Sequence, residues 1–288
     1  WFTNDDFVLA LAKEIHHDVL IKRPKTSVYI NGALHQLDSP KHVLLFTQLS
    51  IIERFRMASV LGLLRYNPFW EPQFVNKFGD FVPEISLAWF WARITKRTPS
   101  LAYPEGGFLS FANHLTEEIR DKGGKVHFST ELIELREEET VILKAKDGNS
   151  KEVTHHFDKV IVTLPSFLFA KMTPQLPEDY LKKLHRLKGL GATNLVLRLR
   201  EPFFQDNTYW LSVCDTSSPV MAIVEHTNFM DRKHYNNEYL LYLGNYVSPD
   251  HEYFAMDEKT MLKKFDPFLK NINPNYEQHL IGMKLFKA

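Results

Sequence analysis

The sequence is poor in cysteine, and Cys214 is the single one among its 288 residues. One thiol excludes an internal disulfide and a metal site built on several cysteines, and it is typical of a reducing compartment. We therefore expect a cytoplasmic protein. The 13 histidines are scattered, and the neighbours in His16-His17 and in His155-His156 point to different sides of a helix or strand. The sequence thus predicts no metal centre.

An excess of charge of either sign is also missing. The 35 basic side chains equal the 35 acidic ones, so no net field attracts nucleic acid or anionic lipid. The longest apolar run, about residues 43–52, is too short to span a bilayer, and no basic-then-apolar leader follows Trp1. We expect this run to be a helix packed on the core. The alternative is a peripheral membrane contact through three of its residues and one that follows it: Phe46, Leu49, Ile52 and Phe55.

The sequence contains no glycine-rich loop for a dinucleotide. No Gly-x-Gly-x-x-Gly precedes a helix with a distal acidic residue. The segment GLGAT at residues 189–193 is superficially similar, but a strand-like run, NLVLRL, follows it. A turn before a strand has no helix N-terminus to hold phosphate. No Gly-x-Ser-x-Gly surrounds any serine either, so we expect no hydrolase-type nucleophile.

The first hundred residues have the pattern of helices around one hairpin. Asn31-Gly32 suits a type I′ turn between alternating strands, which predicts a hairpin over residues 27–37. Apolar residues at helical spacing predict helices over residues 5–21 and 49–66. A further helix is expected to start at Ser39-Pro40, because proline is favoured in the first helical turn.

Residues 103–165 combine one amphipathic helix with three strand-like runs. Gly106-Gly107 permits a tight entry into the helix, and Gly123-Gly124 is typical of a left-handed end. Strands are predicted over residues 126–135, 140–145 and 156–163. The last is almost continuously apolar, as expected for a strand that is covered on both faces.

After Pro165 the pattern changes to short alternating strands between two helices, which predicts a mostly antiparallel sheet. The expected helices cover residues 177–187 and 257–271. A ragged end is expected over residues 284–288. The expected strands are residues 192–199, 209–213, 220–225 and 239–246.

Taken in order, four of these passages resemble the superfamily of FAD-dependent amine oxidases, protoporphyrinogen oxidases and phytoene desaturases. They are residues 76–97, 103–115, 123–165 and 209–231, the last reading YWLSV…PVMAIVEHTNFMD. The resemblance is strongest to an uncharacterised branch of NAD(P)/FAD-dependent oxidoreductases. It implies an α+β fold, in which part of a Rossmann-like FAD-binding domain (residues 101–165) is inserted into a substrate domain. The substrate domain would have a helical part at residues 1–100 and an antiparallel sheet with helices at residues 166–288.

The resemblance implies FAD as the cofactor, and its matching strand at residues 129–135 offers backbone groups to the adenine. Leu132 is the expected contact, and a plain buried strand residue is the alternative. The chain departs from the family in lacking the glycine-rich loop and the C-terminal Gly-Asp segment, and in a short junction at residues 68–71. We therefore expect the central part of a longer flavoprotein, with an incomplete FAD site and no activity by itself.

The candidate substrate side lies at the end of an apolar strand, VMAIV, where Glu225, His226 and Asn228 follow. Strand ends present side chains to pockets, so His226 could relay a proton and Glu225 could hold a cation. The alternative is a capped turn with a solvated charged pair. Trp210 and Tyr103 are further candidates to line an aromatic pocket. Trp89 and Trp91 are candidates too, although core packing is favoured for them.

We therefore expect a flavoenzyme that oxidises an unidentified small molecule by hydride transfer to flavin, with the protein supplying orientation and electrostatics. Two alternatives remain open. One is a flavoenzyme like UDP-galactopyranose mutase, for which Arg198 and Arg200 could build a diphosphate site. The other is a flavin-free binding protein of the kind represented by Rab GDP-dissociation inhibitors.

Overall fold

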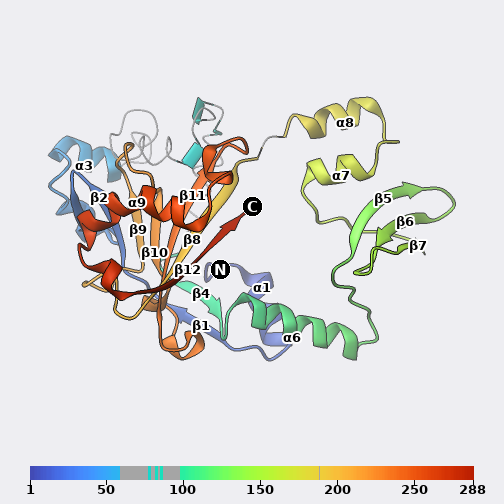
Figure 1. Ribbon diagram of the computed structural model, residues 1–288, viewed down its shortest axis with the longest axis horizontal. Coiled ribbons are helices and arrows are strands. Elements are labelled where there is room, and N and C mark those ends of the chain that lie inside the picture. Colours follow the sequence, from blue (N-terminus) through green and yellow to red (C-terminus); the bar gives the residue numbers. More distant parts are fainter. Residues whose placement is uncertain (59–76, 79–81, 84, 87–97, 188) are drawn as a thin grey trace. The chain divides into compact units, whose positions relative to one another are not determined.

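A computed structural model describes residues 1–58, 77–78, 82–83, 85–86, 98–187 and 189–288 (Figure 1). The chain divides into two compact units. The first unit comprises residues 1–111 and 190–288, and the second unit comprises residues 112–189. Both combine helices with mostly antiparallel strands, so the predicted α+β class is confirmed.

The first unit is built on a seven-stranded sheet with the order β12-β8-β11-β10-β9-β2-β3. All neighbouring strands are antiparallel except β2 and β9, which are parallel. The predicted antiparallel sheet is thus confirmed, with one parallel pair. The strands are β2 (Thr26–Ile30), β3 (Ala33–Gln36), β8 (Gly191–Leu199), β9 (Trp210–Val213), β10 (Ala222–Glu225), β11 (Tyr239–Val247) and β12 (Leu280–Lys287).

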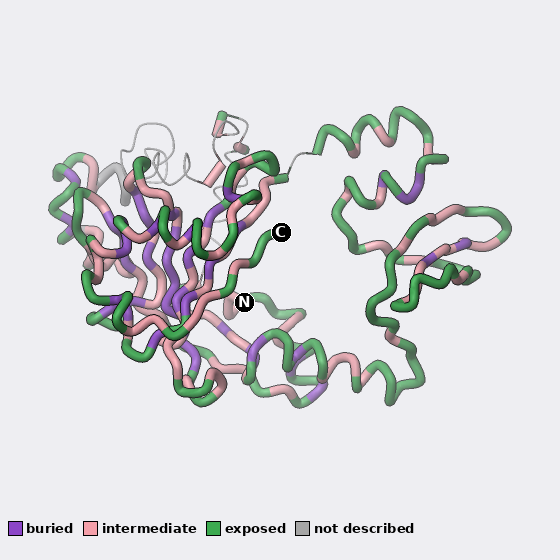
Figure 2. Tube along the Cα trace, in the orientation of Figure 1, coloured by how far each residue is buried: buried purple, intermediate pink, exposed green. Residues whose placement is uncertain are grey.

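One face of this sheet carries the main core. Alternate leucines of β8 and β11 point to this face and are fully buried: Leu195, Leu197, Leu199, Leu241 and Leu243. Helix α9 (Glu258–Ile272) packs in the same core through Met261, Phe265 and Leu269. It begins where Asp257 accepts a hydrogen bond from the amide of Thr260 at 2.8 Å. Figure 2 shows the resulting concentration of buried residues in the sheet.

The opposite face of the same sheet presents larger polar and aromatic groups. Val224 of β10 pairs with Trp210 of β9 on one side and with Tyr242 of β11 on the other. Residues directly opposite in a sheet share a face, so these three side chains form one row. The row is the part of the sheet on which the candidate site is built.

The predicted hairpin is confirmed, because Asn31 and Gly32 have φ of 52° and 79° between β2 and β3. Helix α2 (Pro40–Leu44) begins at Pro40 as predicted, and α3 (Ile51–Ala58) follows. Phe46 and Leu49 pack with Val28 and Cys214 in a second core cluster. Of the proposed membrane-contact residues, these two are therefore buried and Ile52 is 67% exposed, whereas the side chain of Phe55 lies outside the described residues.

The predicted helix over residues 5–21 is too long. Helix α1 (Asp6–Glu14) ends early, because His16 takes a left-handed φ of 55°. The chain continues as β1 (Val19–Lys22), which pairs with β4 (Leu101–Pro104) in a separate two-stranded sheet. Four 3₁₀ turns complete the described part of this unit: η2 (His226–Asn228), η3 (Arg232–Tyr235), η4 (Glu252–Phe254) and η5 (Tyr276–His279).

The second unit contains most of the predicted Gly-Gly helix and a three-stranded sheet with the order β5-β6-β7. Helix α6 (Phe108–Asp121) begins after Gly107 and ends before Gly123, which has φ of 81°, as predicted. The strands are β5 (Glu131–Glu137), β6 (Val141–Lys146) and β7 (Glu152–Phe157). Helices α7 (Ser166–Met172), which was not predicted, and α8 (Glu178–His185) follow.

Two strand predictions in the second unit are wrong. The first strand starts at Glu131 instead of residue 126, because Ser129 has a left-handed φ of 50°. The apolar run at residues 156–163 does not form a covered strand: β7 ends at Phe157, and Ile161 is 91% exposed. The apolar residues of this run therefore lack the cover that their sequence predicts.

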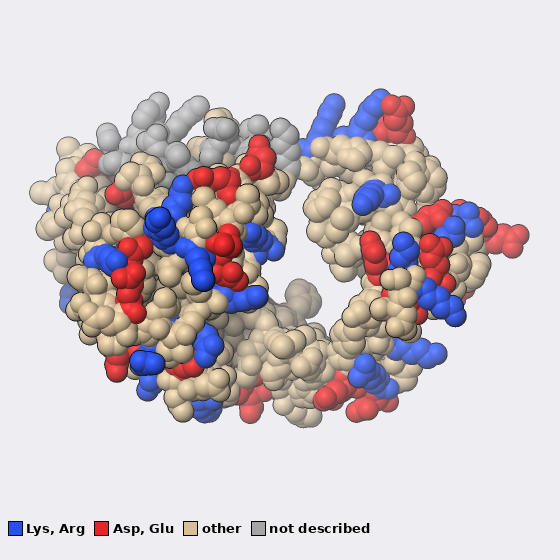
Figure 3. Space-filling view, in the orientation of Figure 1, with Lys and Arg blue, Asp and Glu red and all other residues tan. Residues whose placement is uncertain are grey.

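Lysine and arginine side chains are interspersed with aspartate and glutamate on the face shown in Figure 3. This surface agrees with the zero net charge of the sequence. Within the residues that the structure describes, no helix is both long and apolar enough to cross a membrane.

Candidate functional site

Glu225 ends β10, and its carboxylate is fully buried. The backbone amides of Phe203 and Phe204 each donate a hydrogen bond of 2.8 Å to it. Asn228 donates a third through Nδ2 at 3.1 Å. Burial raises the pKa of Glu225 to about 7, against the lowering effect of these three donors. The carboxylate thus holds the 203–204 loop against the strand end.

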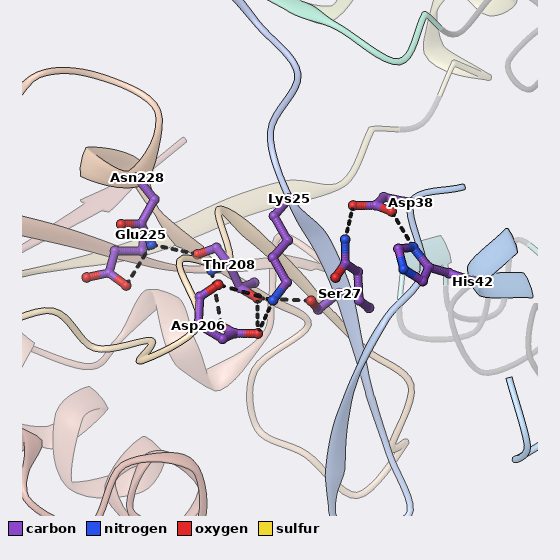
Figure 4. A network of polar contacts seen from close by, with 9 residues as sticks. Lys25, Ser27, Asp38, His42, Asp206, Thr208, Glu225 and Asn228 are labelled. Carbon is purple, nitrogen blue, oxygen red and sulfur yellow. Dashed lines mark hydrogen bonds and ion pairs between the residues drawn. The ribbon is translucent and has the colours of Figure 1, made fainter. Parts of the chain in front are cut away.

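Asn228 belongs to the same polar network, which continues to β2 (Figure 4). Its Nδ2 also donates to the carbonyl of Thr208 at 2.8 Å. The hydroxyl of Thr208 lies 2.9 Å from that of Ser27, and both residues are fully buried. Lys25 and Asp206 form an ion pair of 2.6 Å at the edge of the network. These contacts connect the end of β10 to β2, two strands away in the sheet.

His226 turns away from that network and lies among tyrosines. Its Nε2 is 2.7 Å from the hydroxyl of Tyr235, and its ring stacks on Tyr242 with centroids 5.2 Å apart. The ring of Tyr103 meets it edge-on at 5.1 Å. His226 is only 2% exposed, and burial lowers its pKa to about 4. The imidazole is therefore neutral at physiological pH.

A fourth tyrosine, Tyr209, joins this group through Phe229. The ring of Phe229 lies 5.2 Å from Tyr209 and 6.2 Å from Tyr103. We call the resulting group the tyrosine cluster: Tyr103, Tyr209, Tyr235 and Tyr242 around His226. Burial raises the pKa of all four phenols, to about 12 for Tyr209 and Tyr235, and the neighbouring tyrosines add to the rise for Tyr209, Tyr235 and Tyr242. Each hydroxyl keeps its proton throughout the physiological pH range.

The hydroxyls of the tyrosine cluster differ in their partners. Tyr235 shares a hydrogen bond with His226. In the part of the chain that the structure describes, the hydroxyls of Tyr103, Tyr209 and Tyr242 form no hydrogen bond, and none of the three is a buried unsatisfied atom. All three residues are half-buried. The cluster can therefore offer protonated donors to a bound molecule.

Of the six predicted site residues, the structure brings Tyr103 against His226 and Asn228 against Glu225. Trp210 lies on the same sheet face as Tyr242 but two strands away, and its indole donates to the hydroxyl of Ser212 at 3.0 Å. Glu225 and Asn228 lie at the end of β10, where their side chains form hydrogen bonds with the backbone of Phe203 and Thr208. This geometry favours a supporting role for these two over direct contact with a substrate.

Leu132 lies in the second unit and is half-buried in β5. It pairs with Ala145 of β6, next to an irregularity in the register. Because β5 is at the edge of its sheet, one side of its backbone is unpaired. Trp89 and Trp91 lie outside the described residues.

Sequence reasoning missed Tyr209, Tyr235 and Tyr242 as site residues. The signal was weak, because they and Tyr103 come from four different segments of the chain. The alternation of β11 places Tyr242 on the sheet face opposite to Leu241 and Leu243. A half-buried aromatic residue on that face was a usable sign of a binding site.

The strand predicted to follow Gly189 is confirmed as β8, but the predicted turn at residues 189–193 is too long, because β8 already begins at Gly191. A Cβ on Gly191 would lie 2.3 Å from the ring of Phe254, so glycine is required there by packing. The glycines before β8 therefore form no loop that could hold a phosphate group.

The described residues include no group of three histidine, cysteine, aspartate or glutamate side chains that could hold a metal ion.

A family model for flavin containing amine oxidoreductases matches residues 31–281. No curated protein matches the sequence. Three solved structures share the fold at low identity. An oxidoreductase from Methanosarcina mazei is 18% identical, with a TM-score of 0.72 over 98% of this chain and 73% of that one. A reduced UDP-galactopyranose mutase is 12% identical, with a TM-score of 0.68 over 100% and 70%. A putrescine oxidase bound to putrescine is 11% identical, with a TM-score of 0.66 over 99% and 72%.

Proposed function

Because the chain belongs to the family of flavin-containing amine oxidoreductases, we propose that it forms the substrate side of an FAD-dependent oxidoreductase. The bound flavin would accept a hydride from a small-molecule substrate. The sheet of the first unit would hold that substrate, and residues 101–165 would supply the adenine side of the cofactor site.

The tyrosine cluster is the observation that carries this proposal. It places three hydroxyls without a hydrogen-bond partner among the described residues and one neutral histidine beside the seven-stranded sheet. Such an arrangement can orient a substrate without supplying a nucleophile, which suits a reaction whose chemistry belongs to the cofactor. His226 and Tyr235 share one hydrogen bond and could pass a proton between them. Glu225 would keep this end of the strand in place.

The residues present fit only part of FAD. The unpaired edge of β5 fits backbone recognition of an adenine, with Leu132 as the proposed contact. No glycine loop for the pyrophosphate occurs in the sequence, and Gly191 is occupied by the packing of Phe254. We therefore propose no step through the cofactor within these 288 residues, and we propose that the isolated chain is inactive.

The alternative of a sugar mutase with an arginine-built diphosphate site has less support. Arg198 makes a two-fold contact with Glu238, with one N–O distance of 2.6 Å. A guanidinium that is already paired in this way is a poor free ligand for diphosphate. The structural likeness to a mutase therefore supports a shared fold and no shared reaction.

The experiment is to purify the protein from the complete gene that encodes these residues and to record its visible absorption spectrum. We expect the absorption bands of a bound flavin, which denaturation should release as free FAD. Colourless protein that remains colourless after reconstitution with FAD would refute the enzyme proposal. It would favour a flavin-free binding protein instead.

A further inference from the structure

The chemistry of the tyrosine cluster narrows the class of its ligand. Tyr103, Tyr209 and Tyr242 each bring a protonated hydroxyl without a protein partner in the described part of the chain. Three neutral donors in a half-buried setting are well suited to the oxygen atoms of an anion, because hydrogen bonds to a charged acceptor are stronger than those to a neutral one.

A substrate ammonium group would find little to bind there. Among the described residues, the carboxylates of Glu225 and Glu105 lie near the cluster, and both already have partners in the protein. Glu225 accepts three hydrogen bonds from the protein, and Glu105 contacts His234 at 2.8 Å and Lys233 at 3.3 Å. An ammonium ion at the cluster would therefore lack a free counter-charge.

The aromatic rings do not replace that counter-charge. Tyr103 is in contact with the rings of Phe108, His226 and Phe229, and Tyr242 stacks on His226. A cation–π site needs a free ring face, and these contacts already engage the rings of Tyr103 and Tyr242. Lys22 lies near the cluster, because its Nζ donates to the carbonyl of Phe229 at 2.7 Å and the ring of Phe229 contacts Tyr103 and Tyr209. Its positive charge also favours an anion.

We propose that the tyrosine cluster binds an oxyanionic group of the substrate, a carboxylate or a phosphate. The proposal rests on the proposed function in taking the bound molecule to be the substrate. It assigns the substrate to a chemical class different from that of simple alkylamines. Tyr103, Tyr209 and Tyr242 are the donors. The neutral His226 positions Tyr242 by stacking on its ring and holds Tyr235 through a hydrogen bond.

Ligand titrations of the 288-residue chain, with ¹³C label in the tyrosine rings, provide the test. The probes are sodium acetate, inorganic phosphate and putrescine, each followed by NMR. We expect acetate or phosphate to shift the phenol carbon signals of Tyr103, Tyr209 and Tyr242, whereas putrescine leaves them unchanged. The anion that binds more tightly identifies carboxylate or phosphate as the preferred group.

Tyr242→Phe and Tyr209→Phe keep the rings and remove one donor each. Each variant should weaken anion binding roughly tenfold, the usual effect of one hydrogen bond to a charged group. Tyr29→Phe is the matched control, because Tyr29 lies on the core face of the same sheet, against Phe268. It should bind the anion as the unmodified chain does. Circular dichroism confirms that each variant is folded.

The proposal is overturned if neither anion shifts the cluster signals, or if putrescine shifts them equally. It is also overturned if both cluster variants bind the anion as tightly as the control. These outcomes are separate from the test of the proposed function. A flavin-containing protein that binds no anion would refute only the present inference, and a colourless protein that binds it would refute only the redox function.

Discussion

The two units of the chain bury their apolar residues to very different extents. In the first unit, Phe265 and the leucines of β8 and β11 are completely enclosed. In the second unit, Phe128 and Phe167 are each 63% exposed and Ile161 is 91% exposed. The three-stranded sheet, α7, α8 and the part of α6 in this unit leave these side chains uncovered. The main core of the first unit is therefore enclosed, whereas several apolar side chains of the second unit are largely exposed.

The comparison also separates the two halves of the proposed activity. The tyrosine cluster is assembled entirely from the first unit, as is its support from the buried Glu225 and the half-buried Asn228. The adenine edge is in the second unit, whose apolar run at residues 158–164 lies outside any strand. In the proposed function, substrate recognition would thus fall to well-packed residues of the first unit, and adenine binding to a unit whose apolar residues are in part exposed.

The largest expected difference between the units comes from removing a phenylalanine ring. Phe265→Ala should lower the free energy of unfolding by about 3–5 kcal/mol, because it leaves a cavity in the main core. Phe167→Ala should change it by less than about 0.5 kcal/mol, because that ring is mostly in solvent. Urea unfolding of both variants measures the two values. Equal losses would mean that Phe167 is covered and that the contrast between the units is wrong.

A smaller difference should appear in the pH dependence of stability, which we expect from the buried groups of the first unit. The pKa of Glu225 is about 7 in the folded protein and near 4.5 in the unfolded chain. Raising the pH through this window ionises the unfolded chain first and destabilises the fold, by an amount on the order of 3 kcal/mol. The pKa of His226 is lowered to about 4, so the unfolded chain takes up this proton first as the pH falls from 6.5. His226 therefore destabilises the fold on lowering the pH, whereas Glu225 does so on raising it.

Because the two effects partly cancel, the variant Glu225→Gln is needed to separate them. It removes the Glu225 contribution, so its stability should rise with pH between about 4 and 6.5 and then level off. The unmodified chain should lose stability relative to this variant as the pH rises from 4.5 to 7. Urea unfolding across the pH range measures the difference. A difference that does not vary with pH would show that Glu225 titrates normally and is not enclosed as described.

Local sequence signals predicted the elements whose ends are fixed by one or two residues. Asn31-Gly32 specified its hairpin, Ser39-Pro40 the start of α2, and Gly123 the end of α6. Strands β8 and β11 followed from alternation, because one of their faces is buried in the main core. In these cases the local chemistry and the tertiary packing demand the same conformation.

The failures have a different cause, since they depend on partners distant in sequence. The run at residues 156–163 is apolar enough for a covered strand, but no strand of the described structure lies beside residues 158–163. Strand β12, expected to be ragged over residues 284–288, is ordered by pairing with β8, about ninety residues earlier. The tyrosine cluster could not be predicted, because its members meet only after four segments have packed.

The most direct test of the central claim is a titration of FAD into the purified 288-residue chain, followed by flavin fluorescence or calorimetry. The claim is that this chain carries the substrate side of a flavoenzyme and only the adenine side of its cofactor site. It predicts weak or undetectable binding of FAD, while the protein from the complete gene contains flavin. Tight, stoichiometric binding of FAD by the isolated chain would contradict it.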